Sequence, residues 1–135
     1  MYLGQFLMLG TKVLLTGIIL FGCLCPFAQN QKGAAICFHE HKCDLGKINP
    51  QKYLIKFVYY NSGDHPLVIT KVMVSCSCAS PVWSKEPLQP GVRDTLLVYF
   101  DPHNKIGKAA SSIFVFSNAG AKPAIVRIEA IVSPK

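Results

Sequence analysis

The chain has 135 residues, the length of a single domain, and it carries 14 Lys and Arg against 7 Asp and Glu, a formal net charge of +7. The basic residues stand singly between apolar ones and never form a run, so the charge indicates a solvated surface and argues against a nucleic-acid-binding segment. Ten glycines and nine prolines are spread along the chain, which is typical of a fold with many turns.

Residues 1–28 have the layout of an export signal. One lysine precedes an apolar core at residues 13–25, which is short for a helix that spans a bilayer. Cleavage after Ala28 would release a secreted protein, whereas the run Leu20-Phe21-Gly22-Cys23 is similar to a lipobox and would attach lipid at Cys23. An uncleaved anchor is a third alternative. All three predict an exported domain, in the periplasm, at the cell surface or outside the cell, that meets the membrane only through this segment.

The segments that follow alternate between apolar and polar residues with the period of β-strands. Residues 29–34 read as a short polar linker, and the folded domain is expected over residues 35–133. The alternating segments are 36–48, 53–60, 66–74, 95–100, 111–116 and 126–132. Turn-forming residues separate them at Asn49-Pro50, Asn61–Asp64, Pro81–Gly91, Asp101–Asn104 and Ser117–Pro123. No segment beyond residue 29 has helical periodicity, so the pattern predicts an all-β fold, an antiparallel β-sandwich of about seven strands.

A series of short motifs occurs in a fixed order along these segments. They are Phe57-x-Tyr59-x-Asn61-x-Gly63-Asp64-x-Pro66-Leu67, Ser75-Cys76-Ser77-Cys78, Pro81-x-Trp83, Pro90-Gly91, Val98-x-Phe100-Asp101-Pro102 and Ser117-Asn118. In this order they resemble the bacterial family catalogued as domain of unknown function 1573, over about residues 36–132. The resemblance implies an immunoglobulin-like β-sandwich of the major sperm protein type in an exported protein, and it implies no particular activity.

The chain departs from the family pattern at several positions. Ser77 stands where the family usually has glycine, Ala79 where it has threonine, and Ala130 where it has glycine. Cys37 and Cys43 lie outside the pattern.

Cys76 and Cys78 are the first candidate site. On an extended strand, residues two apart point to the same face and lie roughly 6.5 Å apart, which favours joint contact with a metal ion over a disulfide between them. Three alternatives follow from the pair: a structural disulfide with Cys37 or Cys43, a copper or zinc site, or thiol–disulfide exchange.

The second candidate is the series Cys37, His39, His41 and Cys43, in which a ligand type recurs at every second residue. On a straight strand the four would share one face, and Cys37 and Cys43 would be about 20 Å apart, too far for a disulfide. His39, His41 and Cys43 are therefore candidate ligands of copper or zinc together with the first pair. The alternative is that they are ordinary polar side chains on an exposed edge and that the protein has no cofactor.

The carboxylates are scattered, and the chain has no nucleophile elbow, phosphate loop or HExxH motif. His65 and His103 lie alone in turns, so no residue is predicted to be catalytic. The predicted function is a non-catalytic module of the bacterial envelope that contacts an envelope or extracellular protein through a sheet edge such as Ile36–His41 or Val126–Val132. The alternative is a metal-binding or thiol-redox protein that uses Cys76 and Cys78.

Overall fold

The computed structural model describes residues 32–134, and every regular element in this range is a β-strand. The strands are β1 (Ile36–Phe38), β2 (Lys42–Ile48), β3 (Tyr53–Asn61), β4 (Ile69–Val74), β5 (Ala79–Val82), β6 (Arg93–Phe100), β7 (Gly107–Ser117) and β8 (Gly120–Val132). A search of the same range finds no helix that could cross a membrane. The expected export signal at residues 1–28 lies outside the described residues.

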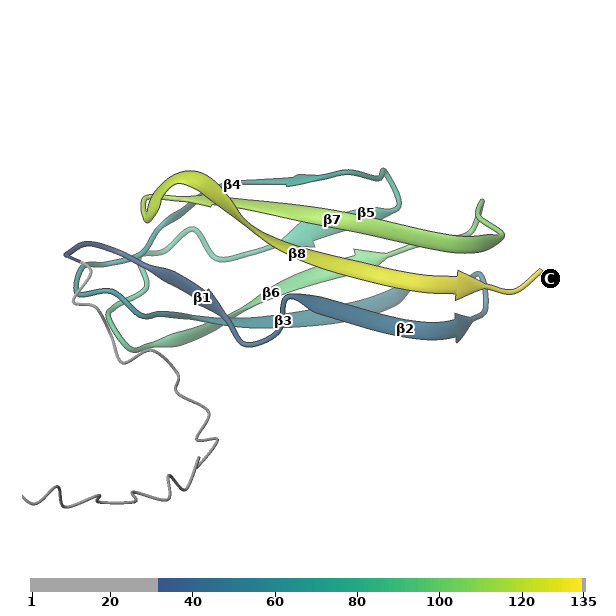
Figure 1. Cartoon of the computed structure of the whole chain (residues 1–135), viewed down its shortest axis with the longest axis horizontal. Helices are drawn as coiled ribbons and strands as arrows, with labels where there is room; N and C mark the ends of the chain where they lie inside the picture. The colour runs from purple at the N-terminus through teal and green to yellow at the C-terminus, as the bar shows by residue number, and fades with distance from the viewer. Residues whose placement is uncertain (1–31, 135) are drawn as a thin grey trace, which may run out of the picture.

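The strands form two four-stranded sheets, with the orders β1-β3-β6-β5 and β2-β8-β7-β4 (Figure 1). The predicted all-β class is confirmed, with eight strands described. Neighbouring strands are antiparallel with one exception, because β2 pairs with β8 in parallel. The arrangement is compatible with an immunoglobulin-like sandwich.

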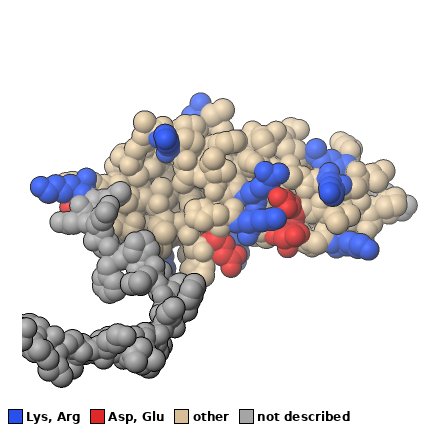
Figure 2. Space-filling view, viewed as in Figure 1, with Lys and Arg blue, Asp and Glu red and all other residues tan. Residues whose placement is uncertain are grey.

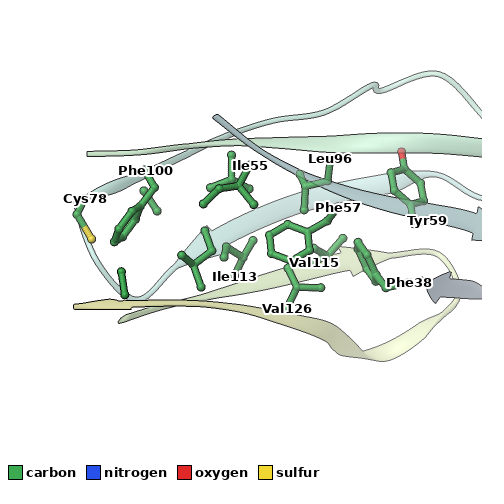
Figure 3. Close-up of a cluster of buried hydrophobic side chains, with 14 of the residues drawn as sticks. Phe38, Ile55, Phe57, Tyr59, Cys78, Leu96, Phe100, Ile113, Val115 and Val126 are labelled. Atoms are coloured by element: carbon green, nitrogen blue, oxygen red, sulfur yellow. The ribbon is translucent and has the colours of Figure 1, made fainter. Parts of the chain in front are cut away.

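The core lies between the two sheets, as the alternation of apolar residues predicts (Figure 3). On β3, Ile55, Phe57 and Tyr59 are buried while the residues between them are more exposed. The most deeply buried side chains come from both sheets. They are Phe100, Leu67, Leu96, Ile113, Ile128, Val98, Val115, Val126 and Val132.

Within the described residues the chain passes between the two sheets five times, and two of these crossovers join edge strands. Between β1 and β2 the amide of His39 donates to the Val58 carbonyl of one sheet, and the His41 carbonyl accepts from the Arg127 amide of the other. The second crossover between edge strands is the short turn between β4 and β5. These two crossovers close opposite sides of the molecule, because β1 and β2 lie at one pair of edges and β4 and β5 at the other.

Asn61 ties the end of β3 to three loops. Its side chain is fully buried, and its Oδ1 accepts from the amides of Ala35 at 3.3 Å and Gly63 at 3.0 Å. Its Nδ2 donates to the carbonyls of His65 at 2.7 Å and Leu88 at 2.9 Å. All the hydrogen-bonding capacity of the buried amide is therefore used by backbone groups, which is what a buried polar side chain requires.

Candidate functional site

The turn between β4 and β5 is held at both ends by other strands. The Ser75 amide donates to the Ser112 carbonyl, and the Ser112 amide donates to the Ser75 hydroxyl, both at 2.9 Å. At the far end the Asp101 amide donates to the Cys78 carbonyl at 2.7 Å. The turn is thus fixed to β7 at its start and to the end of β6 at its finish.

A disulfide joins Cys76 and Cys78 across this turn, with the Cα atoms 5.1 Å apart. The expectation of an extended run was wrong here, because the chain turns between Ser75 and Cys78 and brings the two side chains together. The Cys78 amide also donates to the sulfur of Cys76 at 3.1 Å. Since both thiols are used in the bond, neither is a thiolate ligand for a metal in this form.

The two cysteines differ in exposure. Cys78 has 9% of its surface exposed and packs at the end of the core cluster, as Figure 3 shows. Cys76 is half-buried and packs against the same cluster. A molecule approaching from solvent therefore reaches Cys76 more easily than Cys78.

A hollow of about 240 Å³ lies beside the disulfide. Its lining combines the turn with the loop after β6 and consists of Ser77, Cys78, Asp101, His103, Asn104 and Lys105. The His103 ring nitrogen Nδ1 pairs with Asp101 Oδ1, and this hydrogen bond is the main reason that the pKa of Asp101 lies below its usual range. The hollow therefore has a histidine and a lysine in its lining together with Cys78.

His103 was predicted to lie alone in a turn, but it lines this hollow together with Cys78. More than twenty residues separate Cys78 from His103 along the chain, and no spacing rule connects them. The register of β5 on β6 brings them together, because Ala79 lies opposite Phe100 and the residues beyond each become neighbours.

The series Cys37, His39, His41 and Cys43 does not lie on one straight strand. Cys37 belongs to β1 and Cys43 to β2, in different sheets, with the two histidines in the crossover between them. Both cysteines are free thiols, and burial raises the pKa of Cys43, with the nearby Glu40 and Asp44 carboxylates adding to the rise. His41 Nδ1 lies 3.3 Å from the Ile125 carbonyl oxygen.

Across residues 32–134, no three side chains of His, Cys, Asp or Glu come together in a way that could hold a metal ion. The candidate ligands are instead distributed over two regions. His39, His41 and Cys43 lie at the β1–β2 side of the molecule, and Cys76 and Cys78 lie in the turn that joins the edge strands β4 and β5.

A larger hollow of about 420 Å³ lies on the outer face of the sheet that contains β2 and β8. Glu129 bridges Lys42 at 2.7 Å and Arg127 at 2.9 Å beside it, and Figure 2 shows acidic and basic side chains next to one another there. The hydrogen bond from Lys42 is the main reason that the pKa of Glu129 is lowered. Acidic and basic side chains are therefore mixed on this face, and it carries no field of one sign.

The four sheet edges differ in how well they are protected. β1 has three residues, and β5 has four and includes Pro81. β2 carries a bulge between Asp44 and Lys47, where Gly46 adopts a φ of +63° and its amide donates to the Asp44 carboxylate. Short length, proline, bulges and charges are the usual protections of an edge. β4 has six residues and no proline, and a register shift lies between Ile69 and its one charged residue, Lys71. Beyond this shift, Val72, Met73 and Val74 form a regular edge segment without charge or proline.

One of the two predicted edges is wrong. Residues Val126–Val132 belong to β8, which lies between β2 and β7, so both of its sides are already paired there. The other, Ile36–His41, does include the edge strand β1, but the strand ends at Phe38.

An apolar row reaches the β4 edge on the outer face of its sheet. Met73 lies opposite Phe114 of β7, and Phe114 lies opposite Ile125 of β8. Met73 is 45% exposed and Ile125 is 47% exposed. Since these side chains point away from the core, the fold itself does not account for their apolar character.

Two facing four-stranded sheets, with a disulfide turn joining their edge strands, define an all-β domain. The model of the family described as protein of unknown function DUF1573 matches residues 36–132, so the chain belongs to this family. The predicted resemblance is confirmed. No curated protein matches the chain by sequence.

Solved structures with the same fold are distant in sequence. A protein of unknown function from Porphyromonas gingivalis W83 has 17% identity and a TM-score of 0.67 over 80% of this chain, which spans about half (51%) of that protein. The Vibrio cholerae VesB protease has 19% identity and a TM-score of 0.58, covering 73% of this chain and 31% of its own. The secreted serine protease VesC from Vibrio cholerae has 17% identity and a TM-score of 0.56, covering 76% and 23%. At these identities the likeness extends to the fold alone.

Proposed function

We propose that this protein is a non-catalytic module of the bacterial envelope that binds an extended segment of a partner protein along β4. The observation that carries the proposal is the edge segment Val72, Met73 and Val74 of β4, which lies beyond the register shift between Ile69 and Lys71 and contains no proline and no charged residue. An exposed edge offers a row of backbone groups to an incoming strand.

The backbone groups available on β4 can be named from its register on β7. Ser75 and Ser112 form a hydrogen-bonded pair, and such pairs alternate with non-hydrogen-bonded ones in an antiparallel ladder. Val72 and Val74 occupy the alternate positions, so their N–H and C=O groups point away from β7. A partner strand would add to the sheet by bonding to these two residues.

The side chains beside this edge suit an apolar partner. The row of Met73, Phe114 and Ile125 continues inward from β4 on the outer face. Backbone pairing supplies affinity without sequence preference, whereas contact with such a row would favour apolar residues at alternate positions of the partner. We infer an extended, alternating protein segment as the ligand.

Export is part of the proposal. Residues 1–28 have the layout of an export signal, and a disulfide such as Cys76–Cys78 persists in oxidising compartments. Fractionation of the producing cells should place the protein outside the cytoplasm, and recovery of the reduced chain from the cytosol would refute this part. Mass spectrometry of the mature terminus distinguishes cleavage after Ala28 from lipid attachment at Cys23.

The binding role is tested with a charge placed on the edge. Met73→Glu should abolish retention of the partner from envelope extracts, because a carboxylate would lie within the apolar row beside the pairing groups. Ile131→Glu is a matched control, since Ile131 is 44% exposed on the same face but lies on the interior strand β8.

Hydrogen exchange supplies the second measurement. The amides of Val72 and Val74 should gain protection when the partner is bound. Retention of the partner by Met73→Glu, together with unchanged exchange at both amides, would mean that β4 is not the binding edge.

A further inference from the structure

The disulfide between Cys76 and Cys78 encloses a single intervening residue, Ser77. Because the stabilisation from a disulfide increases with the length of chain that it closes, this bond constrains the unfolded chain far less than a bridge between distant strands would. Hydrogen bonds of Ser75 and Asp101 already hold the two ends of the turn. The bond therefore adds little stability as a cross-link, and a role in thiol chemistry would explain its presence better.

We propose that the Cys76–Cys78 disulfide is a dithiol–disulfide exchange site that accepts two electrons from a cysteine pair of another exported protein. An exchange site needs one sulfur that an incoming thiolate can reach and a second that leaves. Half-buried Cys76 fits the first role, and Cys78, with 9% of its surface exposed, fits the second.

The surroundings of Cys78 suit a departing thiolate. Cys78 lines the hollow that also contains His103 and Lys105, and a thiolate is stabilised by nearby cationic groups. The one carboxylate in the lining, Asp101, is paired with His103. Lys105 lines the same hollow and forms no ion pair with a carboxylate within residues 32–134, so its charge is available to a thiolate of Cys78.

A thiolate of the substrate attacks the sulfur of Cys76, a bond forms between the two sulfurs, the Cys76–Cys78 bond breaks, and Cys78 leaves as a thiolate that takes up a proton. The second thiol of the substrate loses its proton and attacks its own half of the mixed disulfide, which releases oxidised substrate and the thiol of Cys76. Two electrons pass from the substrate to the cysteine pair. A low-molecular-weight disulfide restores the pair by the reverse exchange and leaves as two thiols.

This inference does not rest on binding along β4, because a dithiol that reaches Cys76 from solvent is sufficient. The two proposals are nevertheless adjacent in space, since β4 ends at Val74, two residues before Cys76. The variant Met73→Glu should leave exchange with a small peptide unchanged, so the failure of one proposal can be separated from the failure of the other.

The test uses the full chain purified after export, a reduced synthetic peptide with two cysteines as the probe, and oxidised glutathione as the terminal oxidant. The rate of disulfide formation in the peptide should rise in proportion to the concentration of the protein. Cys76→Ser and Cys78→Ser should each reduce it to the rate without protein. Cys37→Ser/Cys43→Ser should retain the full rate, since these free thiols lie outside the turn.

Trapping on the unaltered chain guards against misfolding of the serine variants. Acid quenching during the reaction should capture the peptide on Cys76. A peptide found on Cys37 or Cys43, or a rate that the unaltered protein does not raise, would overturn the proposal. A reduced pair that takes up zinc or copper(I) in native mass spectrometry and does not exchange would also overturn it, in favour of a metal site.

Lys105 is a positioning residue in this scheme, and its effect is measurable on the unaltered cysteine pair. Lys105→Gln should slow the opening of the disulfide by glutathione about two- to fivefold and raise the pKa of the Cys78 thiol in the reduced form. Lys108→Gln is the control, because Lys108 lines the other hollow. Equal rates and an equal thiol pKa in both variants would contradict the role assigned to Lys105.

Discussion

Asn61 is the residue on which most of the loop structure converges. Its buried amide makes four hydrogen bonds to backbone groups of residues 35, 63, 65 and 88. Its own amide and carbonyl bond Val92 and Gly91. A buried backbone group that has lost its hydrogen-bond partner destabilises the folded state. Replacing Asn61 should therefore destabilise several loops at once.

We predict that Asn61→Ala lowers the free energy of unfolding by about 2–4 kcal/mol, through unsatisfied backbone groups and a small cavity. Denaturant unfolding at neutral pH gives the value. Asn49→Ala is the control, since Asn49 is exposed and should change the free energy by less than about 0.5 kcal/mol. A change as small as that of the control would show that water replaces the amide at no cost.

Gly63 is fixed by close approach of the neighbouring chain. A Cβ atom there would overlap the Gly33 carbonyl oxygen and lie 2.6 Å from the Ala35 nitrogen. Gly120 has nothing within 4 Å of its corresponding position and an ordinary φ. Glycine is therefore required by the packing at position 63, whereas position 120 has room for a side chain.

We predict that Gly63→Ala destabilises the domain by about 1–3 kcal/mol, because backbone must move to admit the methyl group. Gly120→Ala should be neutral or stabilise it by up to about 1 kcal/mol, since alanine reduces the freedom of the unfolded chain. Thermal melts of the two variants measure the difference. Equal melting temperatures would contradict the close contact.

At the scale of elements, the four edge strands differ in how they are protected. β1 and β5 are short, β5 includes a proline, and β2 and β4 each have a register shift, but in β4 the last three residues, Val72 to Val74, stay in regular register. The turn after β4 carries the disulfide, and the loop after β6 supplies the charged side chains beside it. The β4 edge and the disulfide turn thus lie in consecutive segments of one side of the fold.

For the whole molecule, three exposed carboxyl groups connect stability to pH. The amide of Gly33 bonds Asp64, the ring of His103 bonds Asp101, and the ammonium of Lys42 bonds Glu129, and each contact lowers the pKa of its carboxyl group. A carboxyl group whose folded-state pKa is lowered stabilises the protein fully above its unfolded-state pKa. That contribution is lost as the pH falls through the folded-state pKa.

We therefore predict that the denaturant midpoint is steady near neutral pH and falls below about pH 4. The triple variant Asp64→Asn/Asp101→Asn/Glu129→Gln should have a lower midpoint at neutral pH and a flatter acid limb. Added salt should reduce the difference between the two proteins, because the groups are exposed. If the denaturant midpoints of the two proteins fell in parallel below about pH 4, other groups would control the dependence of stability on pH.

Much of the fold could be predicted because burial on one face of a strand leaves a period of two in the sequence. Ile55, Phe57, Leu96, Val98, Ile113 and Val115 were expected to alternate inward and are all buried. The edges could not be predicted, since alternation is the same in a strand at an edge and in one at the centre. Val126–Val132 was taken for an edge for this reason and lies inside its sheet.

The candidate site was predicted only in part. The sequence singled out Cys76 and Cys78 but assumed extended backbone between them, because Ser77 carries no turn signal as strong as glycine. The position of His103 and Lys105 in the same hollow as Cys78 depends on the pairing of β5 with β6, which are far apart in the chain. Spacing along one segment contains no information about such a neighbour.

The order of apolar and polar residues and the family motifs by themselves determined the all-β class, the family and the two cysteines of interest. Only the tertiary structure decided which strands are edges, that Cys76 bonds Cys78, and that the series from Cys37 to Cys43 is divided between two sheets. The physical reason is that alternation records whether a side chain is buried. The pairing of strands depends on which backbone groups come together when the chain folds. These groups often belong to segments that are far apart in the sequence.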